Sequence, residues 1–185
     1  MTPLVVLIDI DAYWYGPRAE FYRYFPKAMQ SSHLAEHFRR CDEVMTRLCC
    51  HAQAQLDGSV LQIHYMTDHP KPLRGVKPDY LNDESALAKH SPLYLCGVSL
   101  DQCVMARPCG YFGELNKGRE DVHIVLDGCI QHMPLTPIDW AKYGKPYRQS
   151  APEDYFSSLE EIEAYRFAFA KANGVRTVLV DDIVN

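Results

Sequence analysis

Short apolar runs separated by turn residues recur along the chain and predict the strands of a sheet. The first run, Leu4 to Ile8, has five apolar residues in succession, which is typical of a central strand covered on both faces. Later runs are likewise short and rich in strand-forming residues. The further candidate strands are residues 60–65, a short one within 73–80, then 93–96, 122–126 and 175–180.

Helical spacing fills the gaps between these runs. After Ser31 and Ser32, apolar residues recur at i, i+4 and i+7 until Asp57-Gly58 ends the pattern, which predicts one long amphipathic helix. A last helix begins at Ser158, which has capping-box spacing to Glu161, and stops at Gly174. The apolar stripe of the long helix is Leu34, Phe38, Cys41, Met45, Leu48 and Ala52, and His33, His37 and His51 are expected at its surface.

This alternation of strand and helix predicts the fold. A strand, a long helical connection and a second strand form a parallel, right-handed unit. We therefore predict one α/β domain over residues 1–185, a doubly wound three-layer α/β/α arrangement with a six-stranded, mainly parallel sheet. Ligands of such sheets bind beyond the carboxyl ends of the strands. The proline-rich segment 134–152 is expected to form a loop or lid over that edge.

Composition narrows the class of protein. The chain has 185 residues, 47% of them apolar and 23% charged, which are ordinary globular values. Its net charge of -5, with 19 basic residues and no basic run, argues against a nucleic-acid partner. No apolar stretch approaches about 18 residues and no signal-peptide pattern opens the chain, so we expect a cytoplasmic protein without a membrane partner. Seven irregularly spaced cysteines indicate reduced thiols rather than a disulfide framework.

Carboxylates follow the first strand directly. Asp9 and Asp11 stand where a buried strand meets solvent, and acids are almost never buried without a partner. They predict either a functional pair or a helix cap or turn. The aromatic segment that follows, with Tyr13 and Trp14, predicts the lining of a substrate pocket, a loop packed on its own rings, or a subunit interface.

A cysteine follows the 93–96 strand after a tight turn. The apolar run stops at Gly97, and Cys103 comes where the next helix is expected to begin. A helix N-terminus favours the thiolate, so the pKa of this thiol is expected below the free value of about 8.5. The backbone N–H groups of such a turn can also hold an oxyanion. The plainer interpretation is a buried cysteine that only fills the core.

The run GVSLDQCV around Cys103 resembles the nucleophile segment of the isochorismatase-like (nicotinamidase-like) cysteine hydrolases, although Leu100 stands where members usually have threonine or serine. The similarity extends to residues 4–9, 122–127 and 174–180. The resemblance implies a catalytic acid at Asp9, a nucleophile at Cys103 and a site lysine. It also implies a cis peptide between Val98 and Ser99. We assign the lysine to Lys77, and Lys71, between two prolines, is the alternative. The expected substrate contacts are Asp11, Tyr13, Trp14, Val98 and Ser99.

We predict neither a cofactor nor a metal. Nicotinamidases bind a divalent metal through an Asp-x-His motif after the second strand, whereas Asp68 and His69 are adjacent here, and adjacent side chains seldom converge on one ion. Members of the family form dimers or tetramers, so a homodimer or homotetramer is expected.

Three functions remain open. The first is hydrolysis of an amide or related C–N bond of a small molecule through a thioester on Cys103. The second is a haloacid-dehalogenase-type phosphatase, with Asp9 as nucleophile, Asp11 as acid, and magnesium held by Asp181 and Asp182. The third is a non-catalytic binding module on the same fold. Within the first, isochorismate-like ethers, aryl amides and ureido compounds all fit the chemistry.

Overall fold

The structure is a computed structural model of the whole chain. It describes residues 1–10, 32–65, 71–73, 75–131 and 156–185, and all statements below refer to these residues. The expected lid segment 134–152 and the aromatic segment after Asp11 lie outside them.

Six strands form one sheet in the order β3-β2-β1-β4-β5-β6, and every neighbouring pair is parallel. The α/β fold class predicted from the sequence is therefore confirmed. The first strand lies inside the sheet between β2 and β4, and all five of its residues are buried, as its unbroken apolar run predicted. The strands are β1 (Leu4–Ile8), β2 (Ser59–Ile63), β3 (Tyr80–Leu81), β4 (Leu93–Val98), β5 (Val122–Ile130) and β6 (Thr177–Val178).

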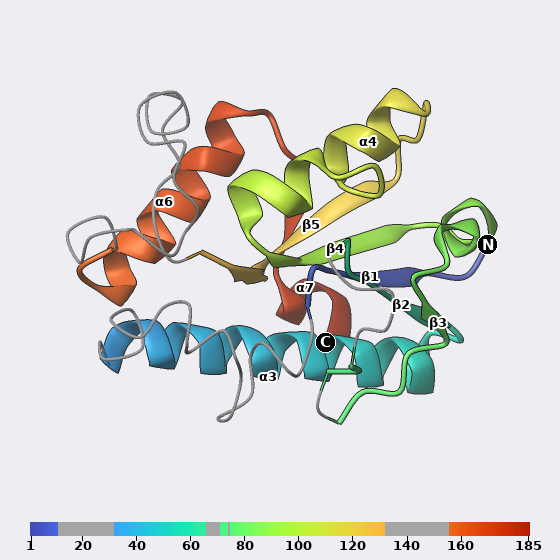
Figure 1. Cartoon of the computed structure of the whole chain (residues 1–185), viewed down its shortest axis with the longest axis horizontal. Coiled ribbons are helices and arrows are strands. Elements are labelled where there is room, and N and C mark those ends of the chain that lie inside the picture. The colour runs from blue at the N-terminus through green and yellow to red at the C-terminus, as the bar shows by residue number, and fades with distance from the viewer. Residues whose placement is uncertain (11–31, 66–70, 74, 132–155) are drawn as a thin grey trace.

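Helices cover both faces of the sheet, so the molecule has three layers (Figure 1). On one face lie α3 (Ser32–Gln55) and the short α7 (Val180–Val184), and on the other lies α4 (Tyr111–Asn116). The remaining helical segments are η2 (Glu84–Lys89), the π-helical turn η3 (Leu100–Val104) and α6 (Leu159–Ala172). None of the helices among these residues is both long enough and apolar enough to cross a membrane.

The buried stripe of α3 differs from the prediction at one turn. Leu34, Cys41, Met45, Leu48 and Ala52 are buried as expected. Phe38 is only half-buried, and the neighbouring His37 is buried instead, with 2% of its surface exposed. The expectation that His37 lies at the surface is wrong. Its Nε2 accepts a 2.9 Å hydrogen bond from the backbone N–H of Gln131, which satisfies the imidazole inside the protein.

The ends of the sheet depart from the sequence pattern. Asp127-Gly128 does not end β5: Leu95 pairs with Ile124 and Gly97 with Cys129, so β5 bulges between these pairs and continues. The last strand is shorter than expected because the chain turns into α7 at Val180. Asp181 and Asp182 therefore lie in the first turn of a helix, and both are exposed to solvent.

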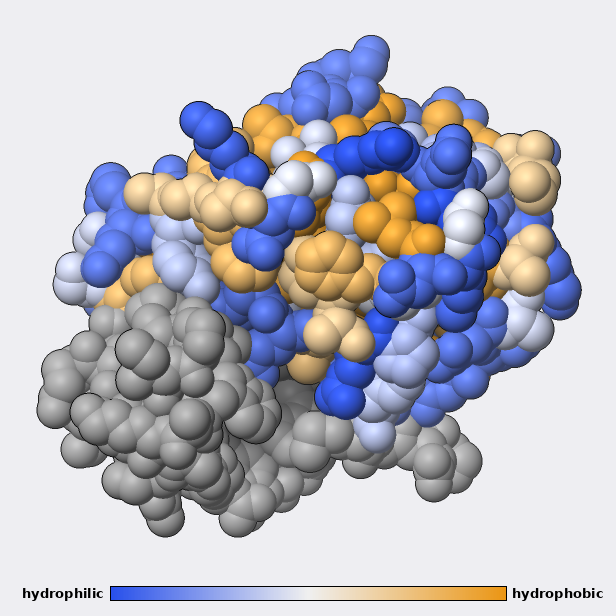
Figure 2. Space-filling model, turned by 90° about the horizontal axis from the view of Figure 1, so that it is seen from above, coloured by the Kyte–Doolittle hydropathy of each residue, from blue (hydrophilic) through white to orange (hydrophobic). Residues whose placement is uncertain are grey.

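Exposed apolar side chains come from separate segments. Among the described residues, Met1, Leu81, Phe112, Phe167 and Leu179 are the large apolar side chains that are exposed. Figure 2 looks onto the α4 face, where apolar side chains are interspersed with hydrophilic ones. The predicted homodimer or homotetramer stays a prediction.

Candidate functional site

Asp9 follows β1 directly and is held in a fixed orientation. Its N–H donates to the carbonyl of Ile63 at 2.8 Å, and its Oδ1 accepts from the N–H of Tyr65 at 2.9 Å. Its φ of 53° lies in the left-handed region, which aspartate tolerates better than most residues. Only 8% of the residue is exposed. A buried carboxylate in this backbone conformation needs partners, and the cation described next supplies the strongest one.

Arg107 is that cation, and the sequence analysis missed it. Its Nε and Nη2 lie 3.0 and 2.9 Å from Asp9 Oδ2, and two-thirds of its side chain is buried. Its guanidinium carbon lies 4.8 Å above the centre of the Tyr65 ring. One signal was present in the sequence: Arg107 is four residues after Cys103, and this spacing places two side chains on the same side of a helical turn.

Cys103 lies in η3, between the carboxyl end of β4 and Arg107. Its thiol lies near enough to the Asp9 carboxylate and the Arg107 guanidinium for both charges to act on its pKa. The Val98–Ser99 peptide bond is cis, as the resemblance implied. The structure thus brings together two of the three residues assigned to catalysis, Asp9 and Cys103, with an arginine beside them.

The pKa of the Cys103 thiol is shifted in the direction opposite to the one predicted from the sequence. Burial, followed by the negative charge of Asp9, raises the pKa of this thiol to about 12, and Arg107 offsets only part of that rise. The expected depression of the pKa is therefore wrong. Cys103 is the fourth residue of a five-residue turn, so it lacks the exposed helix N-terminus that the prediction assumed.

Lys77 does not lie at this site. The carbonyl of Lys77 accepts from the Gln53 side chain, and Asp79 two residues later hydrogen-bonds the backbone of Val60 through both its N–H and its carboxylate. Val60 is near the start of β2, so Lys77 lies at the amino edge of the sheet, opposite Asp9. The physical reason is that residue 77 precedes β3, whereas the assignment placed it after a strand.

Lys71 lies closer to the carboxyl edge. Its carbonyl accepts from the buried Gln62 side chain at 2.8 Å, and the same amide also donates to the carbonyl of Ile10 at 3.0 Å. The Lys71 residue itself is exposed. The backbone here is therefore tied to Ile10, just after β1, while Arg107 is the cation that pairs with Asp9 among the described residues.

Two of the predicted substrate contacts, Val98 and Ser99, are among the described residues and lie in the turn before Cys103. Ser99 is buried and its hydroxyl donates to Asp101 Oδ1 at 3.2 Å, while Val98 is half-buried. Asp101 Oδ2 accepts from Gln131 and from the Tyr165 hydroxyl at 2.8 and 2.7 Å. These bonds anchor the turn to β5 and α6. The other predicted contacts, Asp11, Tyr13 and Trp14, and the metal-motif residues Asp68 and His69, lie outside the described residues.

The acidic pair needed by a phosphatase is engaged elsewhere. Asp181 pairs with Arg47 of α3 at 2.6 Å, and Asp182 accepts from the N–H of Leu179 at 2.8 Å, which caps α7. Neither contacts Asp9 among the described residues, so the structure does not assemble the magnesium site of the phosphatase hypothesis.

The sheet order and the site at its carboxyl edge define a doubly wound α/β protein of the isochorismatase-like fold. This fold is shared with a crystal structure named "putative isochorismatase hydrolase from Oleispira antarctica", at a TM-score of 0.57 and 11% sequence identity. The match covers 99% of this chain and 96% of that one. No protein-family model and no curated protein sequence matches the chain.

Proposed function

We propose that the protein is a cysteine-dependent hydrolase that cleaves an amide or related C–N bond of a small molecule. The observation that carries this proposal is the meeting of Cys103, Asp9 and Arg107 beyond the carboxyl ends of β1 and β4. The shared fold with a structure named as a hydrolase supports the reaction class.

Asp9 is the general base of the proposed reaction. In the resting site the thiol is protonated, because burial and the nearby carboxylate keep its pKa near 12. As the sulfur attacks the substrate carbonyl, its proton passes to Asp9, so no free thiolate has to form beforehand. Asp9 then protonates the leaving amine as the C–N bond breaks. Water then attacks the thioester and gives a proton to Asp9, which passes it to the departing sulfur, so the acid is released and the thiol and the Asp9 carboxylate are restored.

Arg107 takes the electrostatic role that the resemblance gives to a lysine. Its guanidinium is permanently charged and binds Asp9 through two nitrogens, so it holds the carboxylate in place while the proton moves. It also interacts with Cys103 and therefore stabilises negative charge that develops on the sulfur. A lysine could not stack on Tyr65 or bind Asp9 in this forked way.

The oxyanion is assigned to the nucleophile turn. The N–H groups of Gln102 and Val104 both donate to the Ser99 carbonyl, at 3.3 and 3.2 Å. These two N–H groups are therefore already hydrogen-bonded. The developing oxyanion binds to the other N–H groups of the turn, above all that of Cys103.

The alternatives are less well supported. The phosphatase hypothesis lacks its acidic pair beside Asp9, for the reasons given above. A non-catalytic binding module remains the competing proposal, because the fold alone does not require an active site. A module without chemistry has no need of a thiol beside a paired carboxylate and guanidinium, which favours the enzyme.

The test compares Cys103→Ala with Cys50→Ala on a panel of small aliphatic amides, aryl amides and ureido compounds, with released ammonia or amine as the readout. Cys50 is exposed on α3, so its variant is the matched control for loss of one thiol. We expect turnover by the wild type and Cys50→Ala, and none by Cys103→Ala at unchanged melting temperature. Undiminished turnover by Cys103→Ala refutes cysteine catalysis, and no turnover by any form favours the binding module.

A further inference from the structure

A cavity lies between α3 and α6, away from the site around Cys103. Its volume is about 390 Å³, within the range of small-ligand pockets. Its walls carry His37, Arg40, Arg47, Asp127, Glu163 and Arg166, together with the apolar Val44 and Leu159. None of its lining residues belongs to the site around Cys103, so it is independent of the hydrolase reaction.

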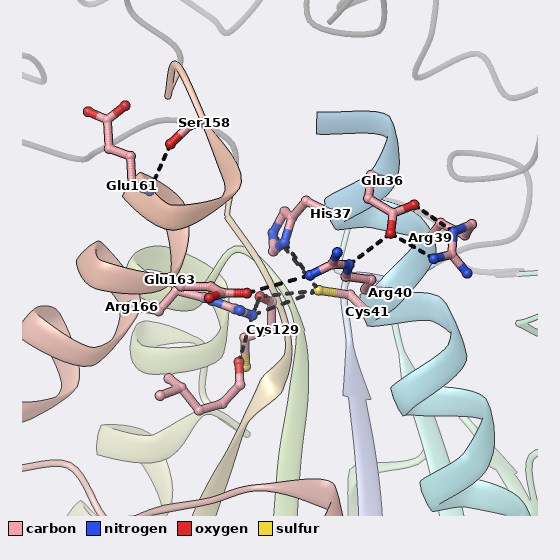
Figure 3. A network of polar contacts seen from close by, with 11 residues as sticks. Glu36, His37, Arg39, Arg40, Cys41, Cys129, Ser158, Glu161, Glu163 and Arg166 are labelled. Atoms are coloured by element: carbon pink, nitrogen blue, oxygen red, sulfur yellow. Dashed lines mark hydrogen bonds and ion pairs between the residues drawn. The ribbon is translucent and has the colours of Figure 1, made fainter. Parts of the chain in front are cut away.

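Arg166 is the unusual member of this cavity. It occupies the buried stripe of α6, between Ile162 and Ala170, where an apolar residue is the normal choice. Only 7% of it is exposed. Figure 3 shows it reaching from α6 toward Cys41 of α3 and Cys129 of β5.

Part of the guanidinium has a structural role. The bulge in β5 frees backbone carbonyls from the sheet, and Arg166 Nη1 donates to two of them, on Leu126 and Cys129, at 3.0 and 3.1 Å. The same nitrogen lies 3.9 Å from the Cys41 sulfur. These contacts explain why an arginine is tolerated here, but they use one nitrogen of three.

The rest of the guanidinium is unmatched. Nε is buried and has no hydrogen-bond partner, and Nη2 donates to none of the described residues. Within the described ranges no carboxylate lies at ion-pair distance from Arg166. Buried charges are normally paired, since an unpaired one loses its hydration without compensation. The charge of Asp127 acts on Arg166 from the same wall, but two nitrogens of the guanidinium lack a hydrogen-bond acceptor among the described residues, and a bound anion would supply one.

The acids around the cavity are committed to other partners. Asp127 accepts from the N–H of Val180 through both oxygens, at 3.1 and 3.3 Å. Glu163 faces Arg40 at 3.7 Å, a pair that Figure 3 shows beside Arg166. Glu43, also on the wall, pairs with Arg39. Among the described residues that line the cavity, Arg166 is the arginine with no carboxylate at ion-pair distance, although the charge of Asp127 acts on it from farther away.

We propose that this cavity binds a small organic monocarboxylate, whose carboxylate pairs with Arg166 and whose apolar part packs against Val44 and Leu159. The volume favours an organic acid over an inorganic anion, because phosphate alone leaves most of it unfilled. The apolar walls favour a short hydrocarbon body over a polyanion.

The test follows the Arg166 Nε–H resonance by NMR in arginine-labelled protein, assigned by its loss in Arg166→Lys. The probes are butyrate, its neutral analogue 1-butanol, and inorganic phosphate. We expect butyrate alone to shift this resonance saturably. A resonance that none of the probes moves overturns the proposal, and so does one that phosphate moves and butyrate does not.

Two variants locate the binding. Leu159→Trp fills the cavity from the rim of α6 and leaves the guanidinium in place, so it should weaken butyrate binding about tenfold or more, because the indole ring takes the space of the hydrocarbon body. Lys171→Met removes one exposed positive charge from the same helix and should bind like the wild type. Equal binding by Leu159→Trp and the wild type places butyrate elsewhere and refutes the site.

Discussion

At the scale of single residues, the charge on Asp9 controls the acidity of the Cys103 thiol. A neighbouring carboxylate disfavours the thiolate, so Asp9→Asn should lower the pKa of Cys103 below its value of about 12. Arg107→Met should act in the opposite direction, because the guanidinium favours the thiolate. The measurement is the rate of iodoacetamide alkylation at Cys103 against pH, resolved from the other cysteines by mass spectrometry.

In the wild type this rate should keep rising with pH above 9, without the plateau of an activated thiol. The exposed Cys50 serves as the internal reference in every sample. A wild-type midpoint below about 8.5, or an Asp9→Asn midpoint above that of the wild type, contradicts the electrostatics argued for the site.

The identity of the site cation can be tested with the two lysines as controls. Arg107→Met should lower kcat/KM by about a hundredfold or more, the scale for losing an electrostatic contact to the reacting groups. Arg107→Lys should recover part of that loss, since the charge returns without the forked geometry. Lys77→Met should match the wild type, because Lys77 lies at the opposite edge of the sheet. A large loss in Lys77→Met with none in Arg107→Met would restore the original assignment.

These residues show how much of the candidate site could be predicted from the sequence. Asp9 and Cys103 each follow an apolar strand, so local pattern sufficed to place both at one edge of the sheet. The assignment of Lys77 to the site was wrong because β3 has only two residues. A strand this short has no periodicity that could show whether the lysine precedes or follows it. Arg107 has one local signal, its spacing of four residues from Cys103, but its pairing with Asp9 and its position over Tyr65 depend on segments distant in the sequence.

At the scale of secondary-structure elements, close contact between β1 and β4 depends on Gly97. Its φ is +137°, and a Cβ there would lie 2.1 Å from the carbonyl oxygen of Ile8. Gly97→Ala should therefore destabilise the fold by on the order of 4 kcal/mol, as expected for a steric conflict inside a packed sheet. Denaturant unfolding measures the loss.

Gly118→Ala is the matched control for that variant. Gly118 also has a positive φ, of +82°, but no atom lies within 4 Å of its added Cβ. Its cost should stay near 1 kcal/mol, from backbone conformation alone. Similar losses in the two variants would mean that the contact with Ile8 relaxes freely.

The start of α6 was predictable because capping is a local interaction. Ser158 Oγ accepts from the N–H of Glu161 at 3.2 Å, and Glu161 in turn accepts from the N–H and hydroxyl of Ser157. Ser158→Ala should lower the free energy of unfolding by about 1 kcal/mol, and Ser158→Asn should preserve it. Thermal unfolding distinguishes the two, and an unchanged melting temperature in Ser158→Ala would show that the cap contributes nothing.

The interior of α6 and β5 was not predictable in this way. Tyr165 and Phe169 look like core positions by their spacing, yet both are half-buried, and Arg166 takes the buried stripe. The cause is the bulge in β5, whose carbonyls need a donor, and a bulge depends on pairing with β4. Likewise α7 packs on the core through Val180, Ile183 and Val184, a long-range contact that has no local signal in the sequence.

At the scale of the whole molecule, a buried ion pair supports a contact between segments that are distant in the sequence. Glu114 of α4 has only 2% of its side chain exposed and pairs with Lys117 and Arg119 at 2.7 and 3.2 Å. Arg119 also donates to the carbonyl of His90, just before β4, at 2.8 Å. Glu114 therefore connects α4 to the start of a central strand.

Removing Glu114 should destabilise the whole fold, because it leaves the largely buried Arg119 without its main partner. Glu114→Ala should cost about 3 kcal/mol, the lower end for breaking a buried pair. For a chain of this length that corresponds to a fall in Tm of on the order of 9 °C. The exposed Glu120→Gln removes the same charge and should change Tm little. Calorimetry measures the Tm of both variants. If Glu114→Ala is as stable as Glu120→Gln, Arg119 has found another partner and α4 does not depend on this ion pair.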